Sequence, residues 1–267
     1  NISDYFSLGI FESIVWTDNN RNVIEAQYLN PFIFFRPVEF STGSSDNALL
    51  GLNLKLIPFK NFVFYSQFII DDIKISELKN DIKHRINPED DSFRWGWFGN
   101  KYGGQIGLKY FDAFTLDNLF LRAEFNAVRP FVFGHSNIEQ SYSHNFQALA
   151  HPMGSNFVEY IFELNYSFGK NNINLFADKA VKGFTSGDNY LGENIFYPVR
   201  DAVSAGVNGD FLTATSYGNE ILQGDKVNFL FVRAEISRSV IESKNLELFI
   251  SGFYRKGWAD YAVQITD

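Results

Sequence analysis

Two features of the sequence predict an all-β fold, a transmembrane antiparallel up-and-down β-barrel of the bacterial outer-membrane type. Apolar and polar side chains alternate with period two in segments of about ten residues. The connections between these segments are alternately short and long, as they are where short periplasmic turns alternate with longer extracellular loops. Composition agrees, because the 267 residues include 30 Phe, 13 Tyr and 4 Trp, and aromatic residues favour strands.

The clearest alternation runs through 158–168, where Tyr160 and Phe162 lie on one face and Glu159 and Glu163 on the other. Segments 119–127, 48–56, 246–255 and 102–110 behave in the same way, and four further segments give a weaker signal. In all, about nine to ten strands are expected, the recognisable ones at 5–16, 48–56, 62–71, 102–110, 119–127, 158–168, 173–182, 227–237 and 246–255.

The connections divide into two classes by length. Four are short and rich in residues typical of hairpin turns: 58–61, 113–117, 169–172 and 241–245. Four are long, and loops of this length are uncommon inside a compact soluble domain: 17–47, 72–100, 130–156 and 183–225. We therefore expect 1–267 to form one partial β-barrel domain with long extracellular loops, and an odd strand count predicts at least one more strand after Asp267.

Charge and composition exclude several other classes of protein. The net charge of −8 argues against nucleic-acid binding, which needs a basic surface. The absence of Cys excludes a disulfide scaffold and a cysteine-ligated metal site. No apolar run approaches the roughly 20 residues of a membrane-spanning helix, so entry into a membrane requires a closed barrel. The alternative is a large β-sandwich with its apolar faces packed together, which leaves the loop alternation unexplained.

Several segments, taken in order, carry a resemblance to a known family. They are 30–40 (NPFIFFRPVEF), 45–53, 97–105 (WFGNKYGGQ), 109–112, 123–130 (AEFNAVRP), 149–159 (LAHPMGSNFVE) and 254–256. Together they resemble the capsule-assembly Wzi family of outer-membrane barrels, and most closely its Bacteroidetes, gliding-motility RemB-like branch. The resemblance covers nearly the whole chain and is weakest at 72–91, which reads as a polar insertion.

The resemblance implies the C-terminal half of an outer-membrane barrel of about eighteen strands that engages capsular or other surface polysaccharide. The expected function is surface-polysaccharide binding or assembly. One alternative is a structural or accessory partner of a gliding-motility or protein-secretion complex, and a second is a passive porin-like channel. Expected partners are the outer-membrane lipid bilayer, surface polysaccharide, and secretion or motility proteins, with no nucleic acid.

Site residues are expected in the lumen or in the long loops, because the outward faces would contact lipid. The charged residues of the lumen face either form cross-strand ion pairs or contact sugars, where Arg would suit acidic groups: Arg122, Glu124, Glu159, Glu163, Arg233, Glu235, Glu247 and Arg255. Trp95 and Trp97 could form an aromatic platform for a sugar ring or belong to an interfacial girdle. Arg36 and Glu39 lie in an apolar segment, where each charge needs a partner.

The 130–156 loop contains His135, His144 and His151. With Glu139 these could bind a metal, but their spacing matches no helical ligand motif, and hydrogen bonding or glycan contact is the preferred interpretation. The segment 150–154 is expected to fold back and constrict the pore, with Pro152 and Gly154 fixing the turn.

Catalysis finds little support, because the adjacent His135 and Ser136 lack an evident base and orienting group, so an enzyme is not expected. No catalytic residue, metal site or cofactor is predicted. The candidate ligand-binding residues are Arg36, Glu39, Trp95, Trp97, Arg129, His151, Asn156 and Glu159.

Overall fold

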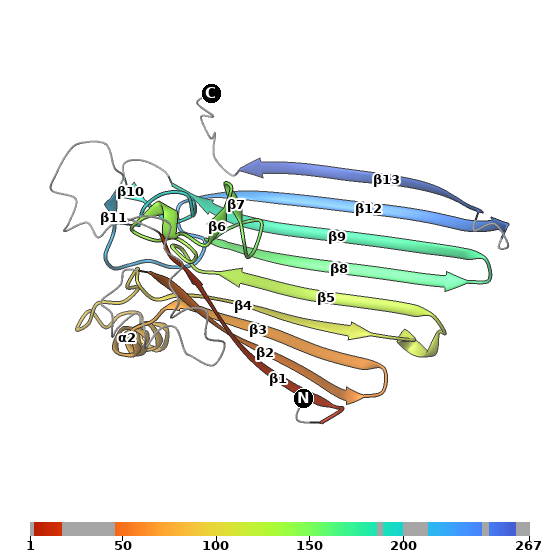
Figure 1. Ribbon diagram of the computed structural model, residues 1–267, viewed down its shortest axis with the longest axis horizontal. Helices are drawn as coiled ribbons and strands as arrows, with labels where there is room; N and C mark the ends of the chain where they lie inside the picture. Colours follow the sequence, from red (N-terminus) through yellow and green to blue (C-terminus); the bar gives the residue numbers. More distant parts are fainter. Residues whose placement is uncertain (1–2, 18–45, 186–188, 200–212, 242–245, 260–267) are drawn as a thin grey trace.

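The computed structural model describes residues 3–17, 46–185, 189–199, 213–241 and 246–259. Nine strands form one antiparallel sheet in which each strand is bonded to the preceding and the following one (Figure 1). They are β1 (Phe6–Val15), β2 (Asn47–Phe59), β3 (Phe62–Asp72), β4 (Lys101–Tyr110), β5 (Leu119–Val128), β8 (Phe157–Phe168), β9 (Asn171–Phe184), β12 (Asp225–Ile241) and β13 (Leu246–Ala259). All nine recognisable strands of the prediction are confirmed, and the chain is all-β in its architecture.

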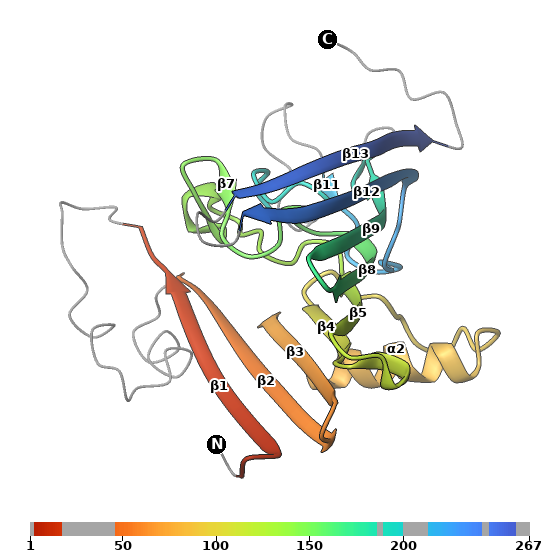
Figure 2. The same ribbon diagram turned by 90° about the vertical axis from the view of Figure 1, so that its right-hand side faces the viewer.

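The sheet curves into an open trough (Figure 2). Its two edges are β1 and β13, which do not pair with each other within the described ranges. The curvature follows from the right-handed twist of the strands, which accumulates from one neighbour to the next. Closure into a barrel therefore stays a prediction.

Every strand contributes apolar side chains to the convex face of the trough. The register places nine apolar side chains, one from each strand, in a single row that crosses the whole sheet. In sheet order they are Phe6, Leu56, Phe64, Leu108, Ala123, Phe162, Ala177, Val232 and Tyr254. Since side chains alternate between faces along a strand, most polar residues of the same strands point to the concave side.

Short turns join the strands at one end of the sheet. The β2–β3 and β8–β9 hairpins each turn over two residues, and Gly169 adopts a positive φ of 58° in the second. In the β4–β5 connection, Asp112 and Phe114 adopt positive φ around a short 3₁₀ turn, η2 (Ala113–Thr115). The turn at 242–245 and most of the 17–47 loop lie outside the described residues.

The long loops at the other end contain secondary structure of their own. The predicted 72–100 loop holds an α-helix, α2 (Ile75–Ile86), where the sequence indicated only a polar insertion. The 130–156 loop holds η3 (Ile138–Gln140) and the β6 (Ser143–His144) and β7 (Gln147–Ala148) hairpin, and the 183–225 loop holds the parallel pair β10 (Asn189–Tyr190) and β11 (Thr213–Ala214). No helix in the described ranges is long and apolar enough to cross a membrane.

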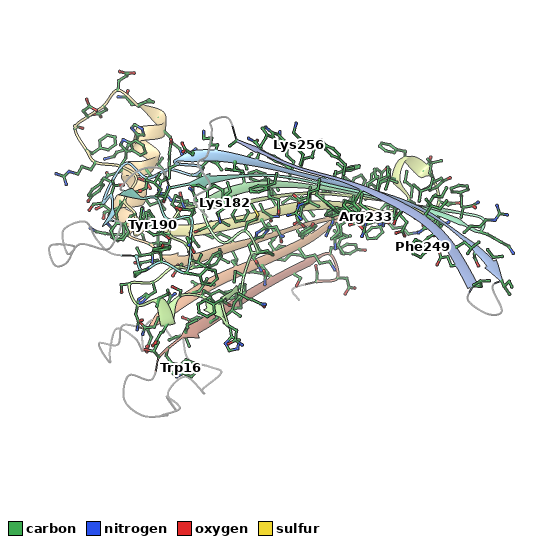
Figure 3. All side chains as sticks on the ribbon, turned by 90° about the horizontal axis from the view of Figure 1, so that it is seen from above. Trp16, Lys182, Tyr190, Arg233, Phe249 and Lys256 are labelled. Carbon is green, nitrogen blue, oxygen red and sulfur yellow. The ribbon has the colours of Figure 1, made fainter. Side chains whose placement is uncertain are left out.

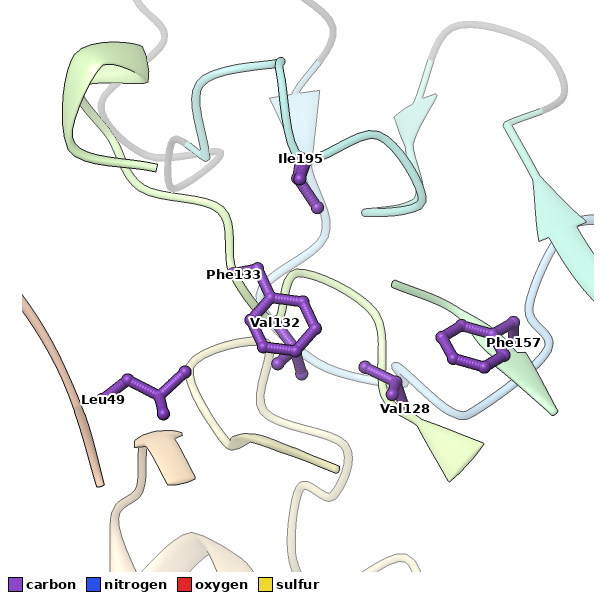
Figure 4. Close-up of a cluster of buried hydrophobic side chains, with 6 residues drawn as sticks. All are labelled: Leu49, Val128, Val132, Phe133, Phe157 and Ile195. Atoms are coloured by element: carbon purple, nitrogen blue, oxygen red, sulfur yellow. The ribbon is translucent and has the colours of Figure 1, made fainter. Parts of the chain in front are cut away.

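The buried hydrophobic core lies at the long-loop end, where the loops meet the concave face (Figure 4). Its larger cluster consists of Leu49, Val128, Val132, Phe133, Phe157 and Ile195, and a second cluster consists of Phe131, Tyr190 and Val199. In the part of the chain that the structure describes, no second large sheet covers the convex face. The sandwich alternative, which required the apolar faces to pack together, is therefore wrong for these residues.

Candidate functional site

A row of polar side chains crosses the concave face from β2 to β8. The strand register places Asn53, Gln67, Gln105, Asn126 and Glu159 directly opposite one another in turn. Gln67 Nε2 donates to Asn53 Oδ1 at 2.7 Å, and Asn126 Nδ2 donates to Glu159 Oε2 at 2.8 Å. The row is thus a cross-strand hydrogen-bond ladder, the arrangement that orders polar side chains on a sheet.

Glu124, one step further along β5, ties this ladder to its neighbours. Its Oε1 accepts from Gln105 Nε2 and from Asn126 Nδ2, both at 3.0 Å. Its Oε2 accepts from the Tyr65 hydroxyl at 2.5 Å. Because the amide donors are engaged on one side by carboxylates, their orientation is fixed before any ligand arrives.

The 150–154 segment folds back onto the concave face, as the sequence predicted. His151 Nε2 lies 3.0 Å from Glu159 Oε2, and the imidazole stacks on Phe157 at 4.4 Å between centroids. The Met153 amide donates to His151 Nδ1, so in the neutral ring Nε2 carries the proton and donates to Glu159. Gly154 has φ of 70°, and its amide donates to the His151 carbonyl to close the turn.

A cavity of about 350 Å³ lies between this folded-back segment and the sheet. Its wall combines three amide side chains, aromatic rings and aliphatic groups. The lining residues are Phe11, Leu49, Gln67, Ile69, Gly104, Gln105, Asn126, Val128, Phe133, Tyr142, Leu149, Ala150 and His151. Such a wall offers both hydrogen-bond donors and acceptors beside flat apolar surface, and its lining residues in the described part of the chain include no Asp, Glu or Arg.

A second cavity of about 540 Å³ lies on the other side of the same segment. Pro152, Met153 and Gly154 form one wall, and Lys182 and Glu193 contribute charge. The Lys182 ammonium donates to the Met153 carbonyl, which holds the segment in place. The folded-back loop therefore divides the long-loop end of the trough into two compartments.

Arg129, Trp95 and Trp97 belong to a different cluster, on the convex side. The Arg129 guanidinium is buried, lies 3.8 Å from Asp81 Oδ2 of α2, and donates to the Asn219 carbonyl at 3.1 Å. Trp95 stacks on His84 of α2 at 4.0 Å between centroids. Trp97 packs edge-on against Phe98. These residues attach α2 to the sheet, and they are separate from the cavity beneath His151.

Asn156 is fully buried and bonded entirely within the protein. Its Nδ2 donates to the carbonyls of Gly183 and Gln223, and its Oδ1 accepts from the Gln223 amide. Asn156 thus holds two long loops together and does not line either cavity. Arg36 and Glu39 lie outside the described residues.

Of the two interpretations of the lumen-face charges, the structure supports ion pairing for Arg122 and Glu163, whose Nε and Oε2 lie 3.0 Å apart on adjacent strands. Glu159 instead bonds His151 and Asn126. His135 is partly buried, and desolvation together with the nearby Lys101 ammonium lowers the pKa of its imidazole. Within the described ranges no three His, Asp or Glu side chains lie close enough together to hold a metal.

The structure adds residues that the sequence did not single out as site candidates. Gln67, Phe133 and Tyr142 line the cavity with His151, although Gln67 lies on β3 and the other two lie in the 130–156 loop. Gln105 lines the cavity as well, from β4. The signal that could have found Gln67 is the cross-strand register, which places it between Asn53 and Gln105.

No family model, curated protein or solved structure matches the chain. The likeness to the Wzi family therefore rests on the sequence segments alone.

Proposed function

We propose that this chain is part of an outer-membrane β-barrel that binds surface polysaccharide in the cavity beneath the 130–156 loop. The observation that carries the proposal is the division of the sheet into a predominantly apolar convex face and a more polar, cavity-bearing concave face. The proposal agrees with the sequence resemblance to the Wzi family.

The exposure of the convex face supports a lipid environment. Tyr160 and Phe162 of β8 are 54% and 45% exposed, and Ile250 of β13 is 78% exposed. Soluble monomers rarely expose contiguous apolar patches beyond a few hundred Å². A face that crosses nine strands, with no second large sheet over it among the described residues, is instead the surface that an outer-membrane barrel presents to acyl chains.

The two sheet edges indicate where such a barrel would continue. Both faces of β13 are exposed, and the view from above shows Phe249 near its short-turn end and Lys256 further toward the long-loop end (Figure 3). An unpaired edge inside a bilayer would leave backbone N–H and C=O groups without partners, at several kcal/mol each. We therefore propose that further strands pair with β1 and β13 to close the barrel.

The chemistry of the cavity supports a neutral, hydroxyl-rich ligand. Gln67, Gln105 and Asn126 can exchange hydrogen bonds with sugar hydroxyls, and Phe11 and Tyr142 offer rings to the apolar side of a pyranose. The nearby Arg122 is already engaged by Glu163, so it is not a free anchor for an acidic sugar. The folded-back loop occupies the trough, which disfavours the passive-channel alternative.

Glycan binding tests this function. In the full-length protein, Gln105→Leu removes a cavity amide and is expected to weaken glycan binding roughly ten-fold, the loss of one or two hydrogen bonds. The matched control is Asn174→Leu. Asn174 is an amide residue of β9 that lies, like Gln105, on the concave face of the sheet but does not line the cavity. Unchanged binding by the Gln105 variant on a glycan array, together with unchanged capsule retention by cells, would contradict the proposal and favour a partner role in motility or secretion.

A further inference from the structure

Helix α2 presents an exposed surface that combines apolar and cationic side chains. Ile75, Ile82 and Ile86 are 66%, 51% and 79% exposed, and their spacing of seven and four residues places them on one stripe of the helix. Lys79 falls on the same stripe, and Lys83 and Arg85 are also exposed. A helix that serves only to cover a core would turn its isoleucines inward.

The acidic residues of α2 are both turned into the protein. Glu77 is 9% exposed and pairs with Lys74 at 3.1 Å. Asp81 is equally buried, faces Arg129, and accepts from the Gly96 amide at 2.6 Å. Every exposed charge that the helix carries is consequently positive, in a chain whose net charge is −8. This separation of charge matches an anionic surface.

The position of α2 relates this surface to the convex face. Arg129, which binds Asp81, shares a hollow with the convex-face residues Phe68, Tyr102 and Phe125, and its guanidinium lies over the Tyr102 ring at 5.2 Å. Figure 1 shows α2 almost end-on, and Figure 2 shows its axis running across the strand direction on the convex side. If the strands cross a bilayer, the helix lies parallel to the membrane plane at the level of the strand ends.

We infer that α2 is an interfacial anchor that binds the phosphorylated headgroups of the outer leaflet. The isoleucines enter the boundary between headgroups and acyl chains, and Lys79, Lys83 and Arg85 contact phosphate, as amphipathic helices with cationic polar faces do. The inference rests on the proposed membrane placement of the strands and is independent of polysaccharide binding. It gives a role to the one stretch, 72–91, in which the family resemblance is weakest.

Lipid-quenching fluorescence on the full chain tests this inference. The chain has no Cys, so a single label can be placed by Ile82→Cys and reconstituted into vesicles containing phosphatidylglycerol and quencher-bearing lipids. The label is expected to be quenched. Ile106→Cys, on the convex face of β4, serves as the membrane control, and Ile138→Cys, in the concave loop, as the water control.

The outcomes separate this inference from the proposed membrane placement. Quenching at position 106 without quenching at 82 overturns the anchor while leaving the barrel in the membrane; absence of quenching at both positions overturns both. Combined Lys79→Gln, Lys83→Gln and Arg85→Gln changes, or vesicles of phosphatidylcholine alone, are expected to lower the quenching at position 82 and leave that at 106 unchanged. Equal quenching at 82 in all these conditions overturns the headgroup assignment.

Discussion

At the scale of single residues, the hydrogen bond between His151 and Glu159 holds the folded-back 150–154 segment against the sheet. The carboxylate is nearly buried, and the imidazole is held from its other nitrogen by the Met153 amide. Removing the imidazole leaves the carboxylate without this donor. We expect His151→Ala to lower the local opening free energy of 150–154 by about 1–2 kcal/mol, roughly a ten-fold rise in amide exchange.

Hydrogen exchange of the full chain measures this effect. His144→Ala is the matched control, because His144 is an exposed residue of the same loop. Equal exchange of 150–154 in both variants would show that the Gly154 turn and the Lys182 contact hold the segment without the imidazole.

His135 predicts a pH dependence in the same loop. Burial is the first cause that lowers the pKa of its imidazole from the ordinary value of 6.5, and the Asn137 amide donates to its Nδ1. A base with a lowered pKa in the folded state stabilises that state fully above its unfolded pKa and less as pH falls toward the folded value. The segment 137–141 should therefore loosen below about pH 6.5.

Amide exchange of 137–141, corrected for the intrinsic pH effect, measures this loosening. His135→Gln keeps an acceptor that does not titrate, so the pH dependence should disappear in that variant. A pH dependence that persists in it would assign the effect to another group.

At the scale of elements, glycines on the concave face leave room for aromatic rings of the adjacent strands. Phe11 lies opposite Gly51, and Tyr65 lies opposite Gly107. A Cβ added at Gly107 would lie 2.2 Å from the Tyr65 ring, so the ring must move and weaken its bond to Glu124. We expect Gly107→Ala to destabilise the sheet by roughly 1–2 kcal/mol.

Urea unfolding in detergent or vesicles measures this cost. Gly252→Ala is the control, since a Cβ at Gly252 meets nothing within 4 Å. Equal urea midpoints of unfolding for the two variants would show that the Tyr65 ring moves aside without loss of stability.

The strands and the cavity differ in how far the sequence predicts them. The strands follow from alternation, because a half-buried strand must repeat every two residues. The helix α2 was missed because the residues it buries are the acidic Glu77 and Asp81, so no apolar stripe marks an inner face. The partners of Asp81, Arg129 and the Gly96 amide, come close to it only in the tertiary structure. The cavity joins Gln67, Phe133 and Tyr142 through sheet register and loop folding, and neither is visible in local sequence.

At the scale of the whole molecule, the central claim is that the convex face contacts lipid and the concave face encloses a polar space. β8 tests it directly, because Tyr160, Phe162 and Leu164 alternate there with Glu159 and Glu163. Site-directed spin labels at successive positions of this strand, in reconstituted vesicles, report contact with oxygen in lipid and with a water-soluble relaxation agent. We expect oxygen accessibility to peak at 160, 162 and 164 and to fall at 159, 161 and 163. High accessibility to the water-soluble agent at 160, 162 and 164 would contradict the account.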